Sequence, residues 1–171
     1  MPLTLAALNS ADSGDFVGAI GHLFEHSPWV AEETYEARPF ATLDELHLAL
    51  CETMLSAPAE KQMALIRAHP DLAGRLAKAG QLTADSTKEQ SAAGLDKLTS
   101  AEAAEIQSLN DAYKARFEFP FIICARLNAK DTILASMRSR VGNAPEAEHS
   151  TALAEIAKIA RLRLNEAVTE N

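Results

Sequence analysis

The chain has 171 residues, 47% of them apolar, which is enough for a single domain with a sizeable core. Its 16 basic and 24 acidic residues give a net charge of −8, which argues against a nucleic-acid binder and against docking on an anionic membrane. Cys51 and Cys124 are too few for a disulfide framework, so we expect buried thiols in a reducing compartment.

Neither end of the chain reads as a targeting segment. The first residues lack a basic n-region, and no stretch approaches the roughly 18 consecutive apolar residues of a membrane span. The last three residues, Thr169-Glu170-Asn171, differ from a Ser-Lys-Leu peroxisomal address. We therefore expect a cytoplasmic protein.

Apolar residues recur with helical spacing along almost the whole chain, and no segment alternates with period two. In chain order the pattern predicts helices over 14–27, from Leu43 to Met54, between Pro58 and Pro70, from about 83–86 to Gly94, and over 100–118, 131–141 and 146–168. Residues 28–42 and 68–82 look irregular. We predict a single all-α domain over residues 1–171 with about seven or eight helices.

The first predicted helix contains His22-Leu23-Phe24-Glu25-His26, which matches the zinc-protease pattern H-x-x-E-H. Two histidines four residues apart on a helix share a face and could both bind zinc, with Glu25 as the base. A third ligand is not evident, and Pro28 ends the helix. The alternative interpretation is a helix end with partly exposed imidazoles.

His69-Pro70-Asp71 follows the helix that Pro70 ends, so His69 lies beside the last carbonyl groups of that helix. The helix dipole favours a cation there, which suits an imidazolium acting as a proton donor near neutral pH. A histidine that only caps the carbonyl groups is the alternative.

Ser86-Thr87-Lys88-Glu89-Gln90 fits the capping box S-x-x-E, in which Ser86 and Glu89 would only satisfy backbone amides. In the functional alternative, Glu89 is the partner of an acid or base. Gln90 then binds a polar ligand through its amide.

Phe119-Pro120-Phe121-Ile122-Ile123 is an apolar block interrupted by proline in a region that is otherwise helical. Proline frees backbone groups of a helix, which could hold a flat polar heterocycle between Phe and Ile side chains. A kinked core helix, resuming through 122–127, is the alternative.

These blocks, in this order, resemble the 2-oxo-4-hydroxy-4-carboxy-5-ureidoimidazoline (OHCU) decarboxylase family of uric acid degradation. The matching stretches are Glu25 to Ala31, Arg38-Pro39-Phe40, Leu65 to Ala73, Ser86 to Gln90 with Ala93-Gly94-Leu95, Asn110 to Tyr113, and Phe117 to Phe121. The resemblance extends from about Phe16 to Leu164, and only Glu118 departs from it, where the family pattern suggests Gly.

The resemblance implies a cofactor-free carboxy-lyase, an all-helical homodimer that converts OHCU to (S)-allantoin. It gives Glu25 and His26 no metal role, and it makes His69 the catalytic acid with Glu89 as its partner. The implied substrate contacts are Pro70, Ser86, Thr87, Lys88, Glu89, Gln90, Phe121, Ile122, Ile123, Cys124 and Ala125. The absence of a peroxisomal ending fits a bacterial cytoplasmic member.

Two arginines of the last predicted helix could bind the substrate carboxylate, and the resemblance favours Arg163. At about 100° per residue, Arg163 falls within the apolar stripe that contains Ile156, Ala160 and Leu164, whereas Arg161 points away from it. An arginine on the core side needs a partner. There are three possibilities: the guanidinium pairs with a protein acid, its long side chain extends to the solvent at the edge of the core, or it binds a ligand carboxylate.

Two other functions stay open at this point. A zinc-dependent hydrolase would use His22 and His26 and would need stoichiometric zinc. A non-catalytic all-α interaction module would leave the decay of OHCU unchanged.

Overall fold

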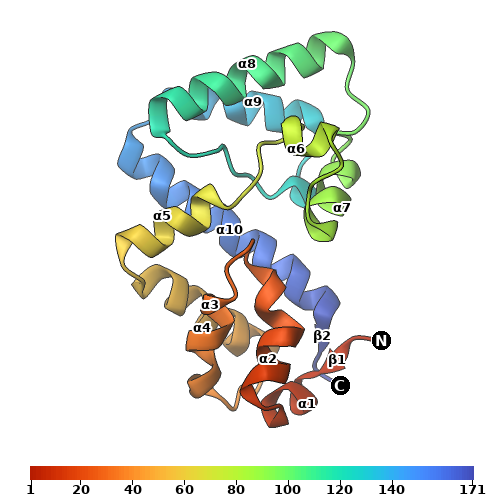
Figure 1. Cartoon of the computed structure of the whole chain (residues 1–171), viewed down its shortest axis with the longest axis vertical. Coiled ribbons are helices and arrows are strands. Elements are labelled where there is room, and N and C mark those ends of the chain that lie inside the picture. The colour runs from red at the N-terminus through yellow and green to blue at the C-terminus, as the bar shows by residue number, and fades with distance from the viewer. The chain divides into compact units, whose positions relative to one another are not determined.

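The computed structural model describes the backbone of residues 1–171 and the side chains of residues 1–74 and 77–171. The chain divides into two compact units, one of residues 1–68 with 157–171 and one of residues 69–156. Helices dominate both units, which confirms the predicted all-α class (Figure 1). No helix in the described part of the chain has the length and apolar character needed to cross a bilayer.

The first unit consists of helices around an apolar core. Its elements are β1 (Leu3–Thr4), α1 (Leu5–Ser10), α2 (Ser13–Ile20), the 3₁₀ turn η1 (Gly21–Leu23), α3 (Trp29–Thr34), η2 (Tyr35–Ala37), α4 (Leu43–Ser56), α5 (Ala59–Arg67), the last part of α10 (Pro145–Ala167) and β2 (Val168–Thr169). Helix α3 packs on α2 and α4, and Phe16, Leu46 and Leu50 are fully buried. The two short strands pair in parallel, with Leu3 opposite Val168, so the two chain ends lie side by side (Figure 1).

The second unit contains all the predicted site residues except Arg163. Its elements are α6 (Arg75–Lys78), α7 (Ala84–Ala92), α8 (Ser100–Phe117), η3 (Ala125–Leu127), α9 (Lys130–Arg140) and the first part of α10. Helix α8 begins with a complete capping box, in which Thr99 and Glu102 satisfy each other's backbone amides. Helices α8 and α9 pack together, and α7 packs against η3.

The long helices agree with the prediction. The short helices raise the number of helices in the structure above the predicted seven or eight. Helices α1, α3 and α6 have six, six and four residues, too few for a full apolar period to show. Two of them, α3 and α6, lie in the ranges 28–42 and 68–82, which the sequence marked as irregular. Tertiary packing stabilises such short helices, since their own propensity does not.

The helix predicted over 14–27 is wrong in its second half. Helix α2 ends at Ile20, residues 21–23 form a 3₁₀ turn, and His26 has a left-handed backbone with φ of 47°. A Cβ on Gly21 would lie 3.4 Å from the Cβ of Pro28, so a glycine allows the returning chain to approach this closely. The chain therefore turns one residue after α2 ends, and not at Pro28.

Two further local interpretations are corrected. The N-cap of α7 is Thr83, whose hydroxyl accepts from the Ser86 amide at 3.2 Å, so the capping box of Ser86 and Glu89 is wrong. Helix α8 does not continue as a kinked helix beyond Pro120. It ends at Phe117 with Glu118 in a left-handed conformation, and an extended segment leads to η3.

We predict that Thr83→Ala lowers the free energy of unfolding by about 1 kcal/mol, because α7 loses its N-terminal hydrogen bond. Thr83→Ser keeps a hydroxyl acceptor and should restore most of this loss. Urea unfolding followed by circular dichroism measures both. Equal stability of the Ala variant and the wild type would contradict the assigned cap.

Candidate active site

The loop that follows His69 is held at three consecutive residues. Lys114 pairs with Asp71 (Nζ to Oδ2, 3.1 Å), Asn110 donates to the Leu72 carbonyl at 3.0 Å, and the Ala73 amide donates to the Gln90 side chain at 2.8 Å. His69 itself is buried, with 9% of its surface exposed. The loop is therefore fixed by side chains of α7 and α8 directly after the predicted catalytic histidine.

Helix α7 presents part of the predicted substrate-contacting block on one buried face. Ser86, Glu89 and Gln90 are buried at positions i, i+3 and i+4, whereas Thr87 and Lys88 are exposed. Glu89 lies in the middle of the helix, so an N-terminal capping role does not explain its burial. Because the Gln90 amide oxygen already accepts from Ala73, its two N–H groups are the part that suits a ligand.

The predicted block from Phe121 to Ala125 is buried throughout, and it is extended up to Cys124. Helix α7 packs against η3, which begins at Ala125, so α7 lies beside the end of this segment. The side chains of Phe121, Ile122 and Ile123 are apolar, so any polar recognition by them must use backbone groups. The second unit therefore joins two of the predicted substrate-contacting stretches and ties one of them to the loop of His69.

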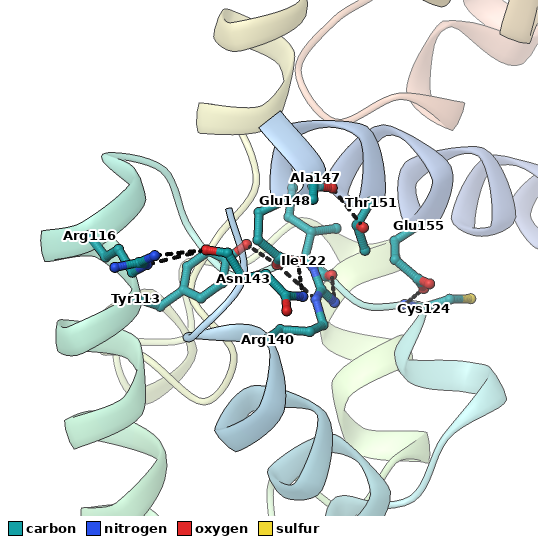
Figure 2. A network of polar contacts seen from close by, with 10 residues as sticks. All are labelled: Tyr113, Arg116, Ile122, Cys124, Arg140, Asn143, Ala147, Glu148, Thr151 and Glu155. Atoms are coloured by element: carbon teal, nitrogen blue, oxygen red, sulfur yellow. Dashed lines mark hydrogen bonds and ion pairs between the residues drawn. The ribbon is translucent and has the colours of Figure 1, made fainter. Parts of the chain in front are cut away.

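A buried carboxylate is linked to the extended segment through Arg140 (Figure 2). Glu148, with no exposed surface, accepts from the Tyr113 hydroxyl at 2.6 Å, from Arg140 Nε at 2.9 Å and from Asn143 at 3.0 Å. Arg140 in turn donates to the Ile122 carbonyl at 2.8 Å, and its guanidinium lies 4.2 Å from the centre of the Phe121 ring. The carboxylate is thus linked to the predicted substrate-contacting segment through one arginine.

Burial and the adjacent Glu148 carboxylate raise the pKa of Tyr113 well above its ordinary value. The hydroxyl therefore stays protonated at neutral pH and remains a donor to Glu148. A raised folded pKa gives stability that is present below the ordinary value of about 10 and is lost above it.

Arg163 is buried, as the helical phase predicts, and Arg161 is partly exposed beside Asp44. The Arg163 guanidinium pairs with Glu25 (Nη1 to Oε2, 2.9 Å), and the two side chains are 3% and 2% exposed. The same nitrogen lies 3.3 Å from the His22 carbonyl. A protein acid is therefore one partner of Arg163, and binding of a substrate carboxylate stays a prediction.

The zinc interpretation depended on His22 and His26 sharing a helix face, and this premise is wrong. His22 lies in η1, His26 has a left-handed backbone, and Glu25 is the buried partner of Arg163. Among the residues whose side chains the structure describes, no group of three or more His, Cys, Asp or Glu side chains is placed to hold a metal ion.

A cavity of about 390 Å³ lies beside α7 in the second unit. Gln90, Thr87 and Ser91 line it on one side, and Ala73 is also among its lining residues. His69 and Glu89 are not among them, so this cavity does not hold the predicted proton donor.

Sequence reasoning assigned no role to Asn110, Lys114, Arg140, Glu148 or Glu155. Asn110 could have been noticed, because it is a polar residue within the apolar stripe of Ile106, Tyr113 and Phe117. Glu148 and Arg140 give no such signal, since charged residues near helix ends are normally solvated.

Comparisons with known proteins agree with the geometry. The sequence model of the OHCU decarboxylase family matches residues 9–165. Similar proteins named 2-oxo-4-hydroxy-4-carboxy-5-ureidoimidazoline decarboxylase include one from Haloferax volcanii, 43% identical over 96% of this chain and 95% of its own length. Another, from Amia calva, is 42% identical over 97% of this chain and 95% of its own length.

A solved structure of (S)-allantoin synthase is 30% identical, with a TM-score of 0.78, over 98% of this chain. The chain spans 54% of that protein's length. A structure of OHCU decarboxylase in the presence of (S)-allantoin matches with a TM-score of 0.69 at 22% identity, which shows the fold alone. The all-helical fold is thus shared with these solved structures. The chain belongs to the OHCU decarboxylase family.

We predict that Gly74→Ala displaces the loop after His69. A Cβ at this position would lie 2.7 Å from the Cβ of Asp71, so Asp71 must move away from Lys114. We expect a loss of about 1–3 kcal/mol in the free energy of unfolding, as for other overpacked sites, together with reduced turnover.

Gly18→Ala is the matched control for this substitution. No atom lies within 4 Å of its added Cβ, and Gly18 is inside helix α2. Alanine should stabilise that helix by up to about 1 kcal/mol. Equal stabilities of the two variants in urea unfolding would show that the close approach of Gly74 to Asp71 has no energetic consequence.

Proposed function

We propose that this chain decarboxylates OHCU to (S)-allantoin in uric acid degradation. The main support for this reaction is membership in the family. The second unit adds support, because a hydrogen bond connects the loop after His69 to α7, the helix that contains Glu89. We also propose that the two compact units form one catalytic domain, since the family match spans both.

The reaction needs an electron sink, a proton donor and control of one face. When the bond between the ring carbon and the carboxylate breaks, carbon dioxide leaves and its electron pair stays on the ring carbon. The adjacent C=N group of the substrate can accept these electrons, and we assign no cofactor to the reaction. Delivery of a proton from the His69 imidazolium to one face of the carbon that bears the ureido group then gives a single enantiomer. The ring hydroxyl passes its proton to the ring nitrogen of the former C=N group and becomes the carbonyl of the product.

Each remaining predicted residue has a role that its chemistry suits. Glu89 holds the His69 imidazole or a substrate group, and Arg163 binds the substrate carboxylate through its planar fork. Ser86, Gln90 and the backbone around Ile123 read the ring and ureido amides. The further proposed contacts are Pro70, Thr87, Lys88, Phe121, Ile122, Cys124 and Ala125. A site that pairs all these groups rejects analogues that lack them.

We further propose a cytoplasmic homodimer. Both cysteines are buried free thiols, which suits a reducing compartment. Leu48 and Leu55 lie seven residues apart on α4, and each exposes more than half of its surface. Two exposed leucines on one helix face suit contact with a second copy.

Circular dichroism of freshly generated OHCU tests the reaction directly. Spontaneous decay gives racemic allantoin, so optical activity should develop only with the enzyme. We predict that His69→Asn abolishes this signal and that Glu89→Gln loses most of it, because neither can supply the charge or proton of the original side chain. Both variants should keep the wild-type helical spectrum. Full activity of either would remove that residue from the chemistry, and an inactive wild type would overturn the proposed function.

We predict that Arg163→Lys lowers kcat/KM by on the order of tenfold or more, because an ammonium keeps the charge but loses the bidentate fork. Arg161→Ala should leave kcat/KM unchanged and cost less than about 1 kcal/mol, as expected for a partly exposed ion pair. Steady-state kinetics beside urea unfolding separates the roles of Arg163. Lost stability with unchanged kcat/KM would leave only its structural pairing with Glu25.

A further inference from the structure

Two acidic residues of α10 control the peptide groups on both sides of Ile123. On one side, Arg140 donates to the Ile122 carbonyl at 2.8 Å, and Glu148 holds Arg140. On the other side, the Cys124 amide donates to Glu155 Oε2 at 2.8 Å (Figure 2). Glu148 and Glu155 are seven residues apart, which places them on the same face of α10.

These contacts determine the directions of Ile123's own polar groups. In a planar trans peptide group the C=O and the N–H point in opposite directions. With the Ile122 carbonyl turned to Arg140, the Ile123 N–H points away from Arg140. With the Cys124 N–H turned to Glu155, the Ile123 C=O points away from Glu155.

The two groups of Ile123 have no partner within the described part of the protein. No other described residue forms a hydrogen bond with its N–H or its C=O, although Ile123 is only 7% exposed. Buried backbone groups are almost always paired, with protein, ordered water or a ligand, so this donor and this acceptor can pair with a bound molecule. Cyclic ureas and ureido groups present both an N–H and a C=O, which a backbone donor and acceptor can pair.

We propose that Glu148, acting through Arg140, and Glu155 are positioning residues that preset the Ile123 N–H and C=O for the amide groups of the substrate. This inference rests on the proposed function. The network gives the segment one orientation before the ligand arrives, which avoids the cost of ordering it on binding. The buried Tyr113 and the side chain of Asn143 complete the hydrogen bonds of Glu148 and hold it in place.

The sharpest test compares Glu155→Ala with Glu155→Gln. Alanine removes the acceptor of the Cys124 amide, whereas glutamine keeps an oxygen acceptor there. We expect Glu155→Ala to lower kcat/KM for OHCU on the order of tenfold to a hundredfold, as for misplaced binding groups, and glutamine to stay within about threefold of wild type. Glu155 is only partly buried, so both variants should fold. Glu146→Gln, an exposed acid on the same helix, is the control that should change nothing.

Arg140→Lys tests the other arm, because one ammonium cannot replace both the Nε contact to Glu148 and the Nη1 contact to Ile122. A second readout is independent of turnover. Titration with (S)-allantoin should shift the Ile123 amide resonance in the wild type and in Glu155→Gln, and much less in Glu155→Ala and Arg140→Lys. If the two acids only stabilised the fold, the folded variants would show the same Ile123 shift as the wild type.

The outcomes separate the inference from the proposed function. A wild type that leaves OHCU at its spontaneous rate of decay overturns the proposed function. An active wild type, with folded Glu155→Ala and Arg140→Lys variants that keep its kcat/KM and its Ile123 response, overturns the positioning role alone. If Arg140→Lys does not fold, the comparison of Glu155→Ala with Glu155→Gln decides whether the positioning role holds.

Discussion

The buried carboxylate of Glu148 is the constraint on which the second unit depends. An ionised carboxylate with no exposed surface is tolerated only when several donors surround it. Here Tyr113 comes from α8, Arg140 from the end of α9 and Asn143 from the turn before α10 (Figure 2). Breaking such a buried pair by removing one partner typically costs about 3–5 kcal/mol, so these elements are held in one arrangement. Arg140 links the extended segment from Phe121 to Cys124 to this arrangement.

The same logic governs the loop after His69. Its backbone is not part of a helix or a sheet, so its polar groups need side-chain partners. Asn110 and Gln90 satisfy a carbonyl and an amide of this loop, and Lys114 neutralises Asp71. Gln90 therefore connects α7 to the loop through its side-chain oxygen. A loop whose polar groups are already paired before binding suits a reaction in which one face must receive the proton.

Arg163 has a structural partner that is independent of its proposed contact with the substrate. A guanidinium that is 3% exposed needs a counter-charge whether or not a substrate is present, and Glu25 supplies it. The pairing also explains why Glu25 belongs to a stretch that matches the family although its motif suggested a metal ligand. The resemblance identified the stretch from Glu25 to Ala31, and the structure shows that the Glu25 carboxylate pairs with Arg163.

Hydrophobic period, proline positions and charge were enough to determine the all-α class, the long helices and the buried phase of Arg163, because these follow from local geometry and from which residues avoid water. The local motifs raised His69 and Glu89 as candidates, and the resemblance gave them the roles of catalytic acid and partner. The tertiary structure decided the rest. It ended α2 at Ile20 through the packing of Pro28 on Gly21 and moved the cap of α7 to Thr83, which left Glu89 in mid-helix. It also made residues 120–124 extended, because Arg140 and Glu155 satisfy backbone groups there that a helix would otherwise pair with its own. Such long-range partners leave no periodic trace in the sequence, so only the folded chain reveals them.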